Sequence, residues 1–225
     1  PMFRPLLGTW QHRCAAGAQE QAWIPPDGCQ DLVGIALPGG SVQWHVYALS
    51  PQAETIALPA GARLRGFRLA PGTQVNTEAL LQRTHTLDLD DAPRATALLA
   101  DTCMLHARVE ESLQALAQAP SVTQAARSLG VSPRTLERLL HRHTAHTPAF
   151  WRSLARVRQT ARCLAAQPHW SLAEVAALHH WADQSHMNLA FRHWLGCTPR
   201  QLQRDPQRLG LLLQSGYGDQ RLITP

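Results

Sequence analysis

The side chains best suited to chemistry in this sequence are arginines that recur with other polar groups at helical spacing. The clearest set follows Pro133, where leucines recur at i, i+3 and i+4 and leave a polar outer face on the predicted helix, formed by Arg134, Thr135, Glu137, Arg138, His141 and Arg142. Guanidinium groups are permanently charged donors that suit phosphate groups and base edges. The pattern therefore indicates binding of a nucleic acid rather than catalysis.

The distribution of charge supports the same conclusion. Residues 1–118 carry 8 Arg against 11 Asp and Glu, a net charge of −3, whereas residues 119–225 carry 13 Arg against 5 acids, a net charge of +8. A basic half joined to a mildly acidic half is typical of a nucleic-acid binder with a separate second role. A solvated basic face would need only scattered charges, so the helical spacing favours DNA.

Two stretches of the second half repeat one another and predict the elements that hold these side chains. Ser121 aligns with Ser171 at an offset of 50 residues and Thr147 with Thr198 at 51, so the second copy has one extra residue in its turn. Serine can cap each first helix, and Gly130 can adopt the left-handed conformation that ends the first one, after which Val131 is expected to fill the core. Ser132 and Pro133 then start a second helix. Two copies in register predict two helix-turn-helix units.

A long helix from Pro148 to Ala166 is predicted between the copies, and Pro168 ends it. Its inward side chains are Phe150, Trp151, Leu154, Val157, Ala161 and Leu164, and its polar side carries Arg152, Arg156, Arg158 and Arg162. Such a helix can hold two DNA-reading units at a fixed separation, and units about 34 Å apart would meet successive major-groove segments.

Over roughly residues 119–204 the chain resembles the AraC/XylS family of transcription regulators. The resemblance is carried by "SVTQAARSLGVSPRTLERLLHRH" and by "SLAEVAALHHWADQSHMNLAFRHWLGCTPRQLQ". It implies binding to asymmetric DNA sites near promoters, most often with activation of transcription. It implies that Arg134, Thr135, Glu137 and Arg138 face base edges, that His141 and Arg142 face phosphate, and that the second unit presents Gln184, Ser185, His186 and Asn188.

Two departures from the family pattern fall in the second unit. His180 precedes Trp181 where the family usually has glycine, and Leu189 stands where an arginine is frequent. We therefore expect the second unit to turn less comfortably and to read bases more weakly than the first.

The first half alternates short apolar runs with proline and glycine. Strands are expected at Leu32 to Leu37, Val42 to Leu49, Glu54 to Leu58 and Leu64 to Leu69, which suits a small barrel or sandwich. "IPPDGCQDLVGI" and "LRGFRLAPGT" resemble the cupin-like sensor domain that precedes DNA-binding regions of the AraC type. That resemblance implies an effector pocket or a dimer surface.

The candidate effector-binding residues are Trp10, Trp23 and Trp44, although tryptophan in a small barrel usually fills the core. His12, Cys14, Cys29 and His45 lack the spacing of a metal site, so no metal or other cofactor is predicted. The five cysteines are widely spaced and are expected to be reduced.

The sequence therefore predicts an α+β protein whose small β-rich barrel or sandwich is followed by an all-α domain with two helix-turn-helix motifs joined by a linker helix. The expected parts are a cupin-like sensor or dimerisation domain at 1–88, a helical connector at 89–119, the DNA-binding domain at 120–204 and a loosely ordered tail at 205–225. The expected function is regulation of transcription, as an activator, without catalysis; the alternative is a cupin-like metal-dependent enzyme or a DNA-modifying protein.

The expected partners are double-stranded DNA, a small-molecule effector, a second copy of the chain in a homodimer and RNA polymerase. The first residues lack the apolar stretch of a secretory signal, and apolar runs such as Leu211 to Leu213 are too short to cross a bilayer. A cytoplasmic location without membrane contact is expected.

Overall fold

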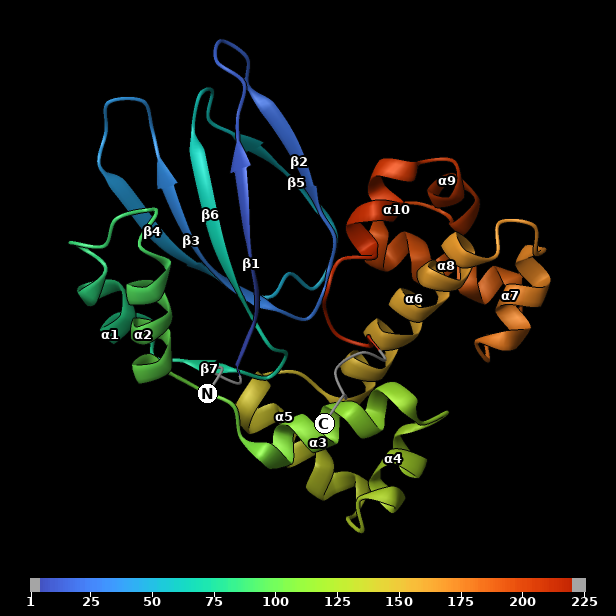
Figure 1. The fold of residues 1–225 in the computed structure, drawn as a ribbon. Coiled ribbons are helices and arrows are strands. Elements are labelled where there is room, and N and C mark those ends of the chain that lie inside the picture. The colour runs from blue at the N-terminus through green and yellow to red at the C-terminus, as the bar shows by residue number, and fades with distance from the viewer. Residues whose placement is uncertain (1–4, 220–225) are drawn as a thin grey trace. The chain divides into compact units, whose positions relative to one another are not determined.

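The computed structural model describes residues 5–219 and divides the chain into two compact units (Figure 1). Unit 1 consists of the residues up to Ala22 together with Cys29–Leu49 and Thr55–Ala107. Unit 2 consists of Trp23–Gly28, Ser50–Glu54 and the residues from Arg108 onward. Unit 1 is rich in strands and unit 2 is helical, which confirms the predicted α+β class.

Unit 1 is built on a four-stranded antiparallel sheet in the order β1-β6-β3-β4. These strands are β1 (Leu6–Arg13), β6 (Arg63–Leu69), β3 (Gln30–Ala36) and β4 (Val42–Tyr47). Two smaller pairs join β2 (Glu20–Ile24) with β5 (Glu54–Leu58) and β7 (Gln74–Val75) with β8 (Cys103–Met104). The four predicted strands are confirmed as β3, β4, β5 and β6, whereas β1, β2, β7 and β8 were not predicted.

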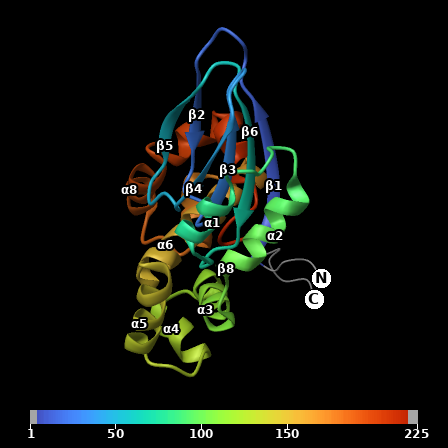
Figure 2. The same ribbon diagram turned by 90° about the vertical axis from the view of Figure 1, so that its left-hand side faces the viewer.

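The four-stranded sheet buries side chains on both faces because successive residues of a strand point to opposite sides. On one face, Leu32 and Phe67 pack with side chains of α1 (Thr77–Arg83) and α2 (Ala92–Thr102), the helices that Figure 2 shows in front of the sheet. On the other face, Val33 and Leu64 pack with Leu58 of β5. Because β2 and β5 cover this second face as a separate pair, the arrangement is a sandwich rather than a closed barrel.

Each of two tryptophans in unit 1 lies on a glycine of the neighbouring strand. Trp10 is paired with Gly66 and Trp44 with Gly34. A Cβ atom at Gly66 would lie 2.0 Å from Trp10 Cε2, and one at Gly34 would lie 2.9 Å from Trp44 Cη2. Only glycine leaves room for these indole rings, so both tryptophans are packed into the sheet.

Unit 2 contains two helix pairs joined by one long helix, and Figure 1 shows the pairs near opposite ends of that helix. The first pair is α4 (Val122–Ser128) and α5 (Pro133–Thr144), and the second is α7 (Leu172–Leu178) and α8 (Gln184–Leu195). The long helix α6 (Pro148–Ala166) has the predicted bounds. The remaining helices are α3 (Ala107–Gln118), α9 (Pro199–Gln203) and α10 (Pro206–Leu212).

The expectation of a loosely ordered tail is wrong for residues 205–219. Asp205 caps α10, and Tyr217 is buried with its hydroxyl donating to the Leu113 carbonyl at 2.7 Å. The sequence pattern missed this because the buried groups are separated by turn residues without helical period. Residues 220–225, the rest of the predicted tail, lie outside the described residues, as do residues 1–4 of the predicted N-terminus.

Candidate nucleic-acid interface

The turn of the first helix pair has the geometry that the sequence predicted. The Ser121 hydroxyl accepts from the Gln124 amide, and the Ser132 hydroxyl accepts from the Thr135 amide, so both helices are capped. Gly130 has a φ of 67°, and the Val131 amide donates to the Ala126 carbonyl at 3.0 Å. These bonds satisfy carbonyls at the end of α4 and set the direction in which α5 leaves the turn.

The second pair repeats this turn with a different residue at the left-handed position. Ser171 forms a capping box with Glu174, and Asp183 caps α8. His180 has a φ of 57°, and the Trp181 amide donates to the Ala176 carbonyl at 2.9 Å. A residue with a Cβ atom is disfavoured in this conformation, so the second turn carries the backbone strain that the sequence led us to expect.

The outer face of α5 is exposed as predicted. Leu136 and Leu140 are buried beneath it. All six predicted DNA-contacting side chains of this helix are exposed, namely Arg134, Thr135, Glu137, Arg138, His141 and Arg142. Helix α5, the second helix of the first helix-turn-helix unit, therefore presents three arginines and one glutamate to solvent.

The outer face of α8 differs from the predicted set at two positions. Gln184, Ser185 and His186 are exposed, but Asn188 is half-buried and its Oδ1 atom is buried without a hydrogen-bond partner. Leu189 is 65% exposed, which is unusual for a large apolar side chain. Sequence reasoning noted Leu189 as a departure from the family pattern but missed it as a candidate DNA contact.

Buried residues show which positions of α5 and α8 are equivalent. Leu136 and Leu140 match Met187 and Phe191 at an offset of 51 residues. At this offset Leu189 takes the place of Arg138 on the outer face. Arg134 and Thr135 likewise correspond to Ser185 and His186, and His141 and Arg142 to Arg192 and His193.

The polar side of α6 was predicted to be a solvent-exposed basic face, but its arginines bond to other segments of unit 2. Arg158 is 1% exposed, which corrects its predicted place on the polar side. Its Nε donates to the Tyr217 carbonyl at 2.8 Å and its Nη2 to the Gln214 carbonyl at 2.9 Å. A side chain of this length can span from the helix to a returning chain segment that the helical pattern does not reveal. Part of the positive charge in the second half is therefore structural.

The two turns are anchored differently. Trp181 is buried, its indole Nε1 donates to Thr160 Oγ1 at 3.1 Å, and the Arg156 guanidinium lies 3.7 Å from its ring centroid. Val131, at the same place in the first turn, is 38% exposed. The expectation that Val131 fills the core is therefore wrong: its amide closes the turn, but its side chain stays partly exposed.

The three tryptophans predicted to bind an effector are not brought together. Trp10 and Trp44 pack into different core clusters of unit 1, where their indole nitrogens donate to Asp31 and to the Leu87 carbonyl. Trp23 belongs to unit 2 and lies against Arg208, whose guanidinium is 5.2 Å from its ring centroid. An effector site at these residues stays a prediction.

A small cluster in unit 1 joins Glu20 to His12 and Cys14, two of the four residues that the sequence analysis weighed as metal ligands. His12, Cys14 and Glu20 each offer a ligand atom within 4.8 Å of the others. Glu20 accepts from the Ala15 amide and from His12, and these bonds lower the pKa of its carboxyl. Burial, and then the charge of Glu20, raise the pKa of the Cys14 thiol, which disfavours the thiolate that a metal needs. Hydrogen bonds account for the contact of Glu20 with His12 and Ala15, and we assign no metal to the cluster.

A family model described as a helix-turn-helix domain matches residues 125–205, which span both helix pairs and α6. Residues 125–205 form an AraC-type helix-turn-helix domain. This AraC-type domain identifies a DNA-binding regulator of transcription.

Comparisons of the whole chain are less informative than the domain match. No curated protein matches the chain in sequence. Among solved structures, ToxT from Vibrio cholerae is similar with 7% identity and a TM-score of 0.47, covering 92% of this chain and 98% of ToxT. An apo form of ToxT with a single substitution, also from Vibrio cholerae, is similar with 7% identity and a TM-score of 0.41, covering 87% and 96% of the two chains.

Within residues 5–219, none of the helices combines the length and the apolar character that a membrane crossing requires.

Proposed function

We propose that this chain regulates transcription, as an activator, by placing α5 and α8 in two successive segments of the major groove on one face of duplex DNA. One observation carries the proposal: two helix-turn-helix units with matching caps and turns are joined by the single helix α6. Each unit turns an exposed helix outward, as this motif does when it enters a groove. We take residues 120–204 as the DNA-binding domain.

In the first helix-turn-helix unit, recognition of DNA rests on charged side chains of α5. Arg134 and Arg138 suit the two acceptors of guanine, and Glu137 suits the amino group of cytosine. Thr135 can bond to either kind of base edge. His141 and Arg142, further along α5, are better placed for phosphate.

In the second helix-turn-helix unit, recognition of bases rests on neutral side chains of α8. Gln184 and Ser185, at the start of α8, suit phosphate, whereas His186 and Leu189 lie on the exposed face. An exposed leucine at the centre of this face suits the methyl group of thymine. Asn188 suits adenine only after a rearrangement that exposes its half-buried amide.

Unit 1 has its own two-sided core and supplies a second role. We propose that it binds a small effector or a second copy of the chain, that the regulator acts with RNA polymerase, and that it works in the cytoplasm, where bacterial DNA is. No step of this role needs a catalytic group or a cofactor.

Fluorescence anisotropy with a labelled duplex of mixed sequence tests the DNA-binding claim. Binding at the phosphate backbone predicts that log K falls linearly with log salt, at about −0.9 for each neutralised phosphate. The substitution Arg142→Ala should flatten this slope by about 1 unit, whereas Arg13→Ala on β1 of unit 1 should leave it unchanged. A flat salt response of the parent protein would contradict docking through these faces.

A further inference from the structure

A cavity of about 640 Å³ opens beside α6 in unit 2. Its walls carry three arginines of that helix, Arg152, Arg156 and Arg162, and one acid, Asp219. With histidine neutral, the charged groups at the cavity sum to +2. An excess of positive charge around a recess of this size suits a ligand that carries negative charge.

The arginines are held in place by backbone carbonyls, which accept bonds but bring no net charge. Arg152 Nε donates to the Ala119 carbonyl at 3.3 Å, and its Nη2 donates to the Pro120 carbonyl. Arg156 Nη1 donates to the His180 carbonyl at 3.2 Å. Within residues 5–219, Arg162 has a carboxylate partner, Asp219 at 2.7 Å, and Arg152 and Arg156 have none. Among the described residues, two guanidinium groups are therefore positioned without a counter-charge.

Three buried nitrogens at the cavity have no hydrogen-bond partner among the described residues: Arg156 Nε, Arg162 Nε and His179 Nε2. A buried donor without a partner destabilises the fold, and the cost is larger when the group is charged. Burial lowers the pKa of Arg152 and of Arg156, and the positive charge of Arg152 lowers that of Arg156 further. For the arginines, both observations describe cationic groups that an anion would satisfy, whereas burial and the charge of His180 lower the pKa of His179 and favour its neutral form.

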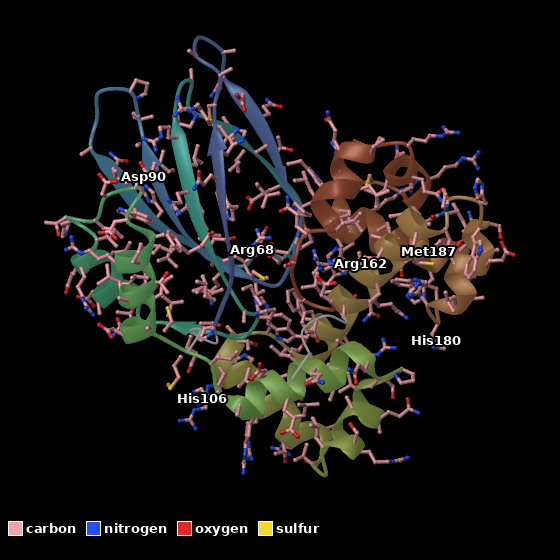
Figure 3. All side chains as sticks on the ribbon, in the orientation of Figure 1. Arg68, Asp90, His106, Arg162, His180 and Met187 are labelled. Atoms are coloured by element: carbon pink, nitrogen blue, oxygen red, sulfur yellow. The ribbon has the colours of Figure 1, made fainter. Side chains whose placement is uncertain are left out.

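We propose that this cavity binds a phosphate group. The tetrahedral oxygens of phosphate can accept from several guanidinium groups at once, and the volume exceeds that of phosphate alone, which leaves room for the rest of a small molecule. The walls reach Pro120, directly before the cap of α4, and His180, in the turn between α7 and α8 (Figure 3 labels Arg162 and His180). A ligand in this cavity therefore lies between the segment that leads into α4 and the turn of the second helix-turn-helix unit.

The phosphate can belong to a free small molecule or to the DNA backbone. Cys163 separates these sources because it lies at the cavity and is half-buried, whereas the other four cysteines are buried. We would measure the rate at which a maleimide alkylates Cys163 in the full chain, read by mass spectrometry. The probes are pyrophosphate, chloride at equal ionic strength, and a DNA duplex of mixed sequence.

A pair of variants at Ala166, an exposed cavity residue at the end of α6, provides the matched control. Ala166→Glu introduces a competing negative charge, and Ala166→Gln has the same shape without it. We expect pyrophosphate to slow alkylation several-fold and to raise the thermal midpoint in the parent and in Ala166→Gln, and to do neither in Ala166→Glu.

Protection by DNA alone, lost in Ala166→Glu and kept in Ala166→Gln, would identify the backbone as the source of the phosphate. If neither pyrophosphate nor DNA changes the alkylation rate or the midpoint, or if the two variants respond alike, the proposal is wrong. The pyrophosphate arm contains no DNA, so its result does not depend on the proposed function.

Discussion

The first helix-turn-helix unit, α4 with α5, and the second, α7 with α8, turn through the same backbone geometry but are held to α6 by different means. The first turn uses Gly130 and leaves Val131 partly exposed, whereas the second uses the strained His180 and buries Trp181 against α6. The outer faces of α5 and α8 differ in charge, because the position of Arg138 in α5 is occupied by Leu189 in α8. The two copies therefore share their architecture, but α5 has the more charged outer face and the second turn is more firmly anchored to α6.

The largest expected effect concerns the anchors. Trp181→Ala should lower the free energy of unfolding by about 3–5 kcal/mol, because it removes a buried indole and its bond to Thr160. Val131→Ala should cost less than about 1 kcal/mol, because Val131 is 38% exposed. Chemical denaturation with a shared slope measures both, and equal losses would contradict the difference in anchoring.

The next effect concerns DNA binding. Arg138→Ala should weaken binding to a selected site by about 1–3 kcal/mol and relax the preference at one base pair. Leu189→Ala, at the equivalent position of α8, should cost less and leave the salt dependence unchanged, because it removes no charge. Anisotropy titrations on single-base variants of the site compare the two, and a larger loss for Leu189→Ala would reverse the assignment of the stronger reader.

A smaller effect concerns the turns. Gly130→Ala should destabilise the protein by about 1–2 kcal/mol, since Gly130 has a φ of 67° and no neighbour within 4 Å of an added Cβ, so backbone strain is the whole cost. His180→Gly should have the opposite sign, a gain of up to about 1 kcal/mol. Gly210→Ala is the control, because an added Cβ at this glycine of α10 also meets open space. This substitution should stabilise the protein by about 0.5–1 kcal/mol, since alanine is favoured over glycine within a helix.

The smallest expected effect is a difference between the N-terminal caps of α7 and α4 in how their contribution to stability depends on pH. Bonds from Ser171 lower the pKa of Glu174 in the folded state, so this group stabilises the fold above its unfolded pKa of about 4.3 and loses that contribution as the pH falls. The thermal-midpoint difference between the parent and Glu174→Gln should therefore shrink below this pH. Gln124→Ala, at the same place in α4, should show no such change, because Gln124 does not titrate.

Local patterns in the sequence predicted the helical half well. The caps at Ser121, Ser132 and Ser171 and the bounds of α6 depend on residues close in the chain, and all are confirmed. The pairing of Trp10 with Gly66 and the burial of Arg158 depend on residues more than 50 positions apart, and no local period reveals them. Leu189 could have been identified from sequence, because its position in the repeat equals that of Arg138.

Selection of binding sites from a random duplex pool, with the purified full-length protein, tests the central claim most directly. Two reading units on one helix predict an enriched motif of about 15–20 base pairs with two unlike boxes one helical turn apart, the box read by α5 being the more strictly defined. Enrichment of a single box, or of no motif, would contradict reading by both units.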